Sequence, residues 1–152
     1  MNKTNISTPI QGCMTWGKWG ANFSTKGYQQ QIKACLELGI STFDHADIYG
    51  GYTTEAEFGK AIAEMKLERS SFQLISKCGI QMENLRDNTV KHYQYDAAYI
   101  VSSAEQSLQN LQTDFLDVFL LHRPSPLMQM EEIQKAIEQL LEQGKIKRFG
   151  VS

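Results

Sequence analysis

The sequence predicts an α/β fold, a parallel-stranded (β/α)8 TIM barrel of which these 152 residues supply roughly the first four and a half β/α units. Two observations predict this fold. Short apolar runs alternate along the chain with longer segments whose apolar residues recur at helical spacing. Four of the runs also stop at, or just before, a chemically capable side chain, as strands do when their carboxyl ends carry a site.

The first three elements follow from apolar runs and their boundaries. A strand is expected at Ile10–Met14, just after Pro9. A helix over Gln29–Leu38 follows, because its apolar residues form one stripe and Gly39 can end it. Ile40–Asp44 is the next strand. One β-α-β unit is therefore complete by residue 44.

The second unit begins with a loop at 49–52. Thr54 and Glu57 have the spacing of a capping box, which predicts that a helix starts there and runs to about Met65. Phe72–Lys77 reads as the third strand.

The rest of the chain continues the alternation. A long loop leads to a helix at Ala97–Leu111, and the nearly continuous apolar run Leu116–Leu121 is typical of a strand buried on both faces. A fourth helix is expected at Met130–Gln143, with Gly144 at its end, and Ile146–Val151 begins a fifth strand. No hairpin signal interrupts this order, so all strands are expected to be parallel with crossover helices.

A Rossmann domain is the competing architecture. It would need a Gly-x-Gly-x-x-Gly turn after the first strand, and Gly12, Gly17 and Gly20 do not fit that spacing. A full barrel typically needs about 250 residues. Residues 1–152 are therefore expected to be the amino-terminal part of a single barrel domain. An uncovered fifth strand would leave the fragment marginally stable or prone to pair with another copy.

Composition excludes several classes of function. Fifteen basic and seventeen acidic residues give a formal charge of −2, which argues against a nucleic-acid partner. No run approaches the length of a membrane span, and residues 1–7 lack the apolar stretch of a signal peptide, so the cytoplasm is the expected location. Cys13, Cys35 and Cys78 are odd in number and widely spaced, which predicts small buried residues rather than a disulfide frame or zinc site.

The residues at the strand ends indicate the chemistry. Asp44, Lys77, His122 and Ser152 each stand at the carboxyl end of an expected strand, and Tyr49 follows in the loop after Asp44. Because the carboxyl ends of parallel strands lie side by side, we expect these side chains to meet on one face. An Asp, Tyr, Lys and His together favour proton transfer to a carbonyl oxygen. Taken singly, each has an ordinary structural interpretation as a cap, a loop aromatic, a solvated cation or a buried imidazole.

Four segments, in this order and spacing, resemble motifs of the aldo-keto reductase family. The resemblance runs from about Ile10 to the last residue, and the His-Ala-Asp-Ile-Tyr-Gly-Gly-Tyr and Ser-Lys-Cys-Gly-Ile stretches are similar to the YdhF-like bacterial branch. The four segments are Phe43–Gly51, Ser76–Gly79, Leu120–Pro124 and Phe149–Ser152.

The resemblance implies a (β/α)8 barrel that reduces aldehydes and ketones with NADPH. The family's catalytic Asp, Tyr, Lys and His fall on Asp44, Tyr49, Lys77 and His122. A small carbonyl compound would be the substrate, the full-length protein would be a monomer, and no metal is needed. Aromatic residues near the site make an aromatic or apolar carbonyl compound plausible.

The chemistry of these four residues can be argued without the family. Hydride addition to a carbonyl develops negative charge on oxygen, so a nearby proton donor lowers the barrier. Tyr49 would be that donor, and a cationic Lys77 within hydrogen-bond reach would ease release of the phenol proton. Asp44 would hold Lys77 in place, and His122 would bind the substrate oxygen or share in the proton relay.

Further residues are implied on the cofactor side. Thr15 and Trp16 match a first-strand loop that lies against the cofactor in the family, Asp44 borders the nicotinamide, and Ser152 matches a serine that holds the carboxamide. The ring-stacking aromatic and the basic residues for the adenosine 2′-phosphate would lie beyond these residues. His45 stands where many relatives carry Ser or Thr.

Three alternatives remain open from the sequence. Asp44, His45, Asp47 and His122 could hold a divalent metal for hydrolysis or isomerisation. A reductase-like barrel could also bind a nicotinamide cofactor without catalysis, as a sensor or partner subunit. Finally, two copies of the chain could pair to close eight strands.

Overall fold

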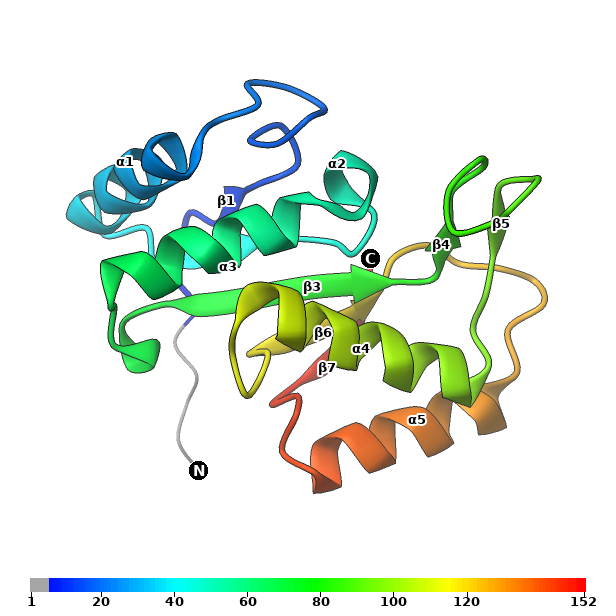
Figure 1. Ribbon diagram of the computed structural model, residues 1–152. Coiled ribbons are helices and arrows are strands. Elements are labelled where there is room, and N and C mark those ends of the chain that lie inside the picture. The colour runs from blue at the N-terminus through cyan, green and yellow to red at the C-terminus, as the bar shows by residue number, and fades with distance from the viewer. Residues whose placement is uncertain (1–5) are drawn as a thin grey trace.

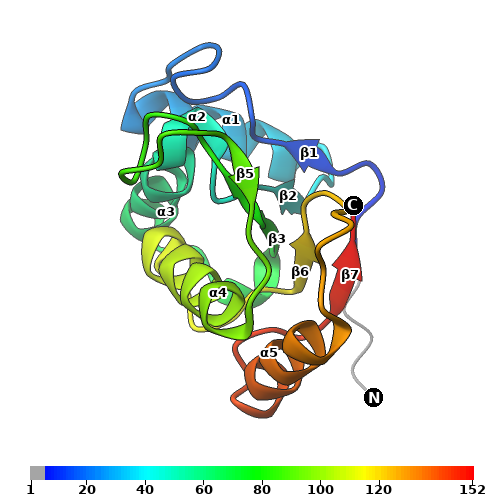
Figure 2. The ribbon, with the colours of Figure 1, turned by 90° about the vertical axis from the view of Figure 1, so that its right-hand side faces the viewer.

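The computed structural model describes residues 6–152, which form one curved, five-stranded parallel sheet with helices on one face (Figures 1 and 2). The strands lie in the order β1, β2, β3, β6, β7, and each neighbouring pair is parallel. The strands of this sheet are β1 (Gln11–Gly12), β2 (Thr42–Asp44), β3 (Gln73–Cys78), β6 (Val118–Leu121) and β7 (Phe149–Val151). The α/β alternation and the parallel sheet expected from the sequence are confirmed.

The long helices connect successive strands of the sheet. Two of these helices have a side chain that caps the amino-terminal end. The helices are α1 (Thr25–Glu37), α3 (Thr54–Met65), α4 (Ala97–Leu111) and α5 (Met130–Glu142). Helix α1 starts four residues earlier than expected, because Ser24 accepts a hydrogen bond from the Gly27 amide as its N-cap. Asp96 caps α4 in the same way through the Tyr99 amide.

The main core lies between the helices and the sheet. Its amino-terminal part is aromatic: the ring of Trp16 meets those of Tyr28, Phe43 and Phe58 at 5.7–6.3 Å between centroids. Phe43 and Phe58 are fully buried, and burial of such a ring contributes about 2 kcal/mol to stability. A second, smaller apolar cluster gathers Ala46, Ile48, Tyr49 and Ile80 near the carboxyl end of the sheet.

Two local features differ from the sequence prediction. The expected loop at 49–52 is a tight turn, α2 (Tyr49–Tyr52), in which Gly50 and Gly51 have left-handed backbone angles, and Thr54 is the first residue of α3 rather than its N-cap. The capping-box prediction is therefore wrong: Thr53 precedes the helix, and its hydroxyl donates to the Gly50 carbonyl at 2.9 Å. A short 3-10 turn, η1 (Arg69–Ser71), leads into β3.

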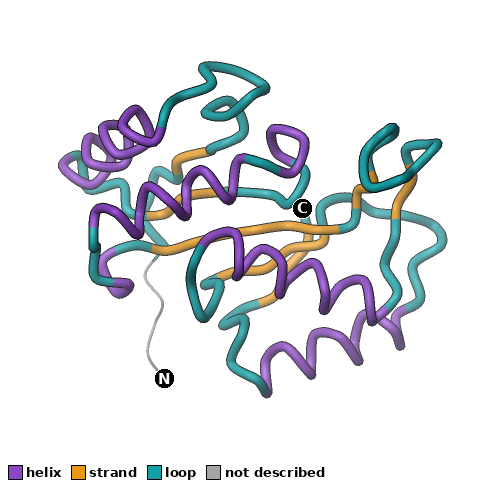
Figure 3. Tube along the Cα trace, in the orientation of Figure 1, coloured by secondary structure: helices purple, strands orange, loops and turns teal. Residues whose placement is uncertain are grey.

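The prediction that the chain contains no hairpin is also wrong. The long loop after β3 contains two short strands, β4 (Ile80–Gln81) and β5 (His92–Tyr93), which pair antiparallel (Figure 3). Two-residue strands joined by a ten-residue loop carry no alternation and no short turn that a pattern could detect. This hairpin rises beyond the carboxyl end of β3 and lies at the same end of the sheet as α2 (Figure 1).

The three cysteines are free and buried, as expected. Among residues 6–152 no helix has the length and apolar character needed to cross a bilayer. The sequence prediction for the amino end, that it lacks a signal peptide, concerns residues that include 1–5, which lie outside the described part of the chain.

Candidate active site

Parallel pairing brings the predicted residues to one end of the sheet. The ladder continues past the named strands: His45 donates its amide to Ile75, and His122 donates its amide to Cys78 at 2.8 Å. The Ser152 amide likewise reaches the Leu121 carbonyl at 3.0 Å. The ends of β2, β3, β6 and β7 therefore form one edge, next to α2 and the chain's carboxyl terminus in Figure 1.

Lys77 is the centre of the site. Its side chain is only 7% exposed, and its Nζ donates to Asp44 Oδ2 at 2.7 Å, to the His45 carbonyl at 2.7 Å and to Tyr49 Oη at 3.1 Å. A buried ammonium is stable only when its charge and its protons are matched. Asp44 supplies the opposite charge, and the three acceptors use all three N–H groups.

Tyr49 reaches this lysine from α2, a turn that ordinary residues would not adopt. Gly50 and Gly51 have left-handed φ angles of 63° and 66°. A Cβ at Gly50 would also approach Thr54 Oγ1 to 2.5 Å. The glycine pair thus lets the chain reverse directly after Tyr49 and turn its ring toward Lys77.

His122 lies beside the phenol. Its ring and that of Tyr49 are 6.0 Å apart at an interplanar angle of 78°. Burial, with the neighbouring charges of Lys77 and Arg123, lowers the pKa of His122 to about 4, so the imidazole is neutral at pH 7. Nδ1 is enclosed without a partner within residues 6–152. Because a buried unpaired N–H is less tolerable than an unpaired lone pair, the proton belongs on Nε2, which can donate to a ligand.

Of the residues expected on the cofactor side, Asp44 belongs to this cluster, and the other three differ in burial. Trp16 is buried in the aromatic part of the main core, whereas Thr15 is exposed in the loop after β1. Ser152 is exposed at the end of β7. The indole nearest the phenol is that of Trp19, 42% exposed, whose ring lies 6.3 Å from that of Tyr49.

A buried pair of carboxyl groups was not expected from the sequence. Asp47 and Glu55 are 4% and 1% exposed. Burial and the charge of Glu55 raise the pKa of Asp47 to about 7, and its Oδ2 accepts from Tyr99 Oη at 3.4 Å. Glu55 accepts from Ser76 Oγ at 2.6 Å. No spacing in the sequence distinguishes these carboxyl groups from ordinary surface residues of a loop and a helix.

The described part of the chain gives no support to the hypothesis that the site holds a divalent metal. Over residues 6–152 no three His, Cys, Asp or Glu side chains are grouped as metal ligands would be. His45, one of the candidates, is fully buried with its ring 4.4 Å from that of Phe58.

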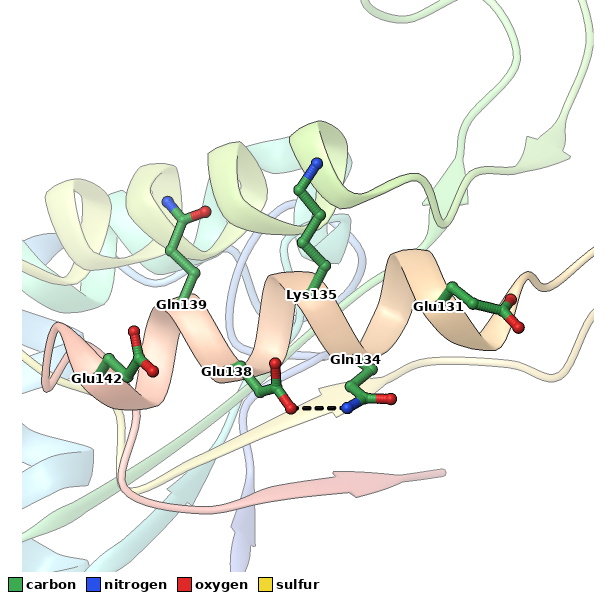
Figure 4. Close-up of a pocket in the computed structure, with 6 residues that line it drawn as sticks. All are labelled: Glu131, Gln134, Lys135, Glu138, Gln139 and Glu142. Atoms are coloured by element: carbon green, nitrogen blue, oxygen red, sulfur yellow. Dashed lines mark hydrogen bonds between the residues drawn. The ribbon is translucent and has the colours of Figure 1, made fainter.

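A hollow of about 410 Å³ on the outer surface is unrelated to this cluster (Figure 4). All of its lining residues come from α5, and a hydrogen bond of 2.7 Å joins Gln134 to Glu138 across it. The lining is formed by Glu131, Gln134, Lys135, Glu138, Gln139 and Glu142.

Comparison with known proteins agrees with this geometry. Residues 10–152 match the model of the aldo/keto reductase family. The chain belongs to the aldo/keto reductase family. It is 44% identical to Oxidoreductase YdhF of Escherichia coli over 137 residues, which cover 90% of this chain and 46% of YdhF. It is 41% identical over 153 residues to 6-dehydroglucose reductase of Agrobacterium fabrum, covering 99% of this chain and 51% of that protein.

Solved reductase structures share the fold. The holo form of aldo-keto reductase AKR11C1 from Bacillus halodurans has a TM-score of 0.78 at 30% identity, over 93% of this chain and 44% of that one. Glycerol dehydrogenase AKR11B4 from Gluconobacter oxydans also gives 0.78, at 26% identity, over 93% and 43%. The barrel class expected from the sequence is confirmed, and this aldo/keto reductase chain spans about half the length of the relatives it matches.

Proposed function

We propose that the protein reduces an aldehyde or ketone to an alcohol by hydride transfer from NADPH, with Tyr49 as the general acid. Membership of a family of oxidoreductases supports the reaction class. The observation that carries the assignment of roles is the placement of the Tyr49 phenol 3.1 Å from a buried lysine that is itself paired with Asp44.

The proton step follows from these contacts. Hydride addition turns the carbonyl oxygen into an alkoxide, and Tyr49 donates its phenol proton to that oxygen. Lys77 stabilises the phenolate that remains, since its ammonium already faces the phenol oxygen. Asp44 keeps the ammonium oriented. The phenolate thus forms beside a positive charge that is already in place, which lowers the barrier to proton transfer.

His122 orients the substrate. The neutral imidazole, protonated on Nε2, donates a hydrogen bond to the carbonyl oxygen beside the phenol. The exposed ring of Trp19, next to Tyr49, favours an apolar or aromatic carbonyl compound.

The residues at the strand ends also suit a nicotinamide. Ser152 is exposed directly after β7 and would bind the carboxamide, and Asp44, the last residue of β2, and Thr15, in the loop after β1, lie at the same end of the sheet. The cofactor, when bound, supplies the hydride. Trp16 would support this end of the sheet from within the core rather than touch the cofactor.

The test uses two proteins. One is the 152-residue chain, and the other is an extended chain in which the same residues are followed by the carboxyl-terminal half of YdhF. NADPH and NADH oxidation is followed with aromatic and small polar aldehydes. We expect turnover with NADPH in the extended chain only, because the part of the site that binds the adenosine phosphate lies outside these residues.

Two variants separate catalysis from structure. Tyr49→Phe should lower kcat by about 10²–10⁴-fold while NADPH binding is unchanged, since only the proton donor is lost. Tyr93→Phe, which alters an exposed tyrosine of the hairpin, should retain full activity. Cofactor binding without turnover in every protein would instead favour the non-catalytic alternative. Equal rates for Tyr49→Phe and the unmodified protein would contradict the role of the phenol.

A further inference from the structure

The hairpin segment 79–95 joins the two halves of the site. It leaves the end of β3 two residues after Lys77 and returns to the sheet side at Asp96, the cap of α4. Between these points it passes α2, which carries Tyr49, and the loop that follows His122. Two tyrosines, one at each of these crossings, make the contacts.

The first crossing is made by Tyr52. This residue is the last of α2, three positions after Tyr49, and has a left-handed φ of 67°. Its phenol donates to the Ile80 carbonyl at 3.3 Å and accepts from the Met82 amide at 3.1 Å. One hydroxyl thereby satisfies both backbone groups along the free edge of β4.

Two more contacts hold the same crossing. The guanidinium of Arg86 lies 3.7 Å from the centre of the Tyr52 ring, on the face of the phenol. The side chain of Leu85 covers Gly51, approaching to 3.5 Å the place that a Cβ would occupy. Hydrogen bonds to Tyr52, the cation–π contact of Arg86 and the packing of Leu85 on Gly51 therefore all link the hairpin to the turn that carries Tyr49.

The second crossing is made by Tyr95, where the segment returns. Its phenol donates to the Arg123 carbonyl and accepts from the Arg123 amide at 3.2 Å. Arg123 directly follows His122. A Cβ at Gly79 would approach the Tyr95 ring to 2.1 Å, so only glycine leaves room for the ring in this position.

We propose that segment 79–95 is a brace that sets the distance between the Tyr49 phenol and the His122 imidazole, with Tyr52 and Tyr95 as its positioning residues. The proposal rests on the proposed function, because it assigns these tyrosines to the geometry of that site. Neither residue touches a reacting atom. Each acts through the backbone of a neighbour, Tyr52 through α2 and Tyr95 through the loop after β6.

Such a brace is needed because few contacts within α2 itself fix its conformation. Four residues form the turn, and two of them are glycines. Lys77, in contrast, pairs with Leu120 of β6, and its carbonyl accepts a hydrogen bond from the Asp47 amide at 3.0 Å. A donor on an unsupported turn would sample positions away from the lysine, and a displacement of about 1 Å is enough to lower a rate substantially.

The experiment compares three Tyr→Phe variants of the extended chain. Tyr52→Phe and Tyr95→Phe each remove one hydroxyl and keep the ring. Tyr93→Phe is the matched control, because it lies on the same segment and its hydroxyl makes no hydrogen bond within residues 6–152. We expect kcat to fall about tenfold in the first two and to stay within twofold in the control, with the KM for NADPH unchanged in all three.

Amide hydrogen exchange gives a readout that does not depend on turnover. In Tyr52→Phe the Gly51 amide, and in Tyr95→Phe the His122 amide, should exchange about tenfold faster than in Tyr93→Phe. Unchanged exchange at both amides, or a KM that rises while kcat is kept, overturns the brace. If the unmodified extended chain turns over no carbonyl compound, the proposed function fails, and the exchange rates alone decide whether the segment holds the two rings.

Discussion

Ionisation of the buried Asp47 opposes folding. Its carboxyl group is buried, one of its oxygens has no partner within residues 6–152, and Glu55 lies close enough to repel it. These effects raise the pKa of Asp47 to about 7, whereas an unfolded chain would titrate near 4. The folded protein therefore binds this proton more tightly between pH 4 and 7, and stability is lost as the pH rises through 7.

Asp47→Asn should accordingly be more stable than the unmodified chain at pH 8, by on the order of 3 kcal/mol. The amide carries no charge and keeps an oxygen for the Tyr99 hydroxyl. The gain should shrink as the pH falls from 7 to 4 and approach zero below pH 4, where Asp47 is protonated in the folded and the unfolded chain alike. Urea unfolding at pH 8 and at pH 4 measures both values. Asp87→Asn, in the exposed loop, is the control, and an equal effect in both variants would contradict the assignment.

At this scale the sequence could predict the four proposed catalytic residues but not their supports. Asp44, Lys77 and His122 are visible because a parallel sheet must align its strand ends. Tyr52 and Tyr95 could not be predicted as supporting residues. Each binds backbone groups of a segment distant in sequence, and no residue pattern indicates such a contact.

Among the elements, the amino-terminal ends of β3 and β6 are held together by one side chain. Arg69 in η1 donates to Asp117 Oδ2 at 2.7 Å and to the carbonyls of Phe72 and Phe115 at 2.8 and 2.9 Å. Its guanidinium also lies 4.0 Å from the centre of the Phe115 ring. Asp117 is 7% exposed on its side chain, and this arginine supplies its opposite charge.

Arg69→Met should therefore destabilise the chain by about 3 kcal/mol, because it leaves a buried carboxylate unpaired. The comparison is Lys33→Met on α1, which removes an ion pair whose two side chains are 71% and 66% exposed. That loss should be under about 0.5 kcal/mol. Thermal or urea unfolding of both variants measures the difference, and similar losses would show that Arg69 adds no more than a surface pair.

Elements with strong periodicity were predictable, and those fixed by single contacts were not. The apolar stripes of α3, α4 and α5 locate these helices to within a residue or two. Helix α1 begins at Thr25 because Ser24 caps it, and α2 forms because Gly50 and Gly51 adopt left-handed angles. In both cases a hydrogen bond or a backbone angle, rather than a pattern, decides the boundary.

Over the whole molecule, β1 and β7 are the outer strands of the sheet. Val151 on β7 is 75% exposed, and Phe149 is 37% exposed. Strands with free backbone groups and apolar side chains pair readily with other chains. The alternation of strands and helices, which indicates a barrel, could be predicted from the sequence. Which strands pair with these two outer strands could not.

The 152-residue chain by itself should self-associate through β7. Val151→Lys places a charge on this strand and should shift sedimentation equilibrium toward the monomer by about tenfold in dissociation constant. Leu38→Lys, at an equally exposed site on the end of α1, should leave it unchanged. A chain that is monomeric at every concentration would contradict the prediction.

The three hydrogen bonds of Lys77 have a further consequence for how such a site can diversify. Asp44, His45 and Tyr49 use every proton of the ammonium, so none remains for a ligand. If Tyr49 is the acid, as proposed, a change of substrate would then involve the surrounding loops rather than the contacts of this lysine.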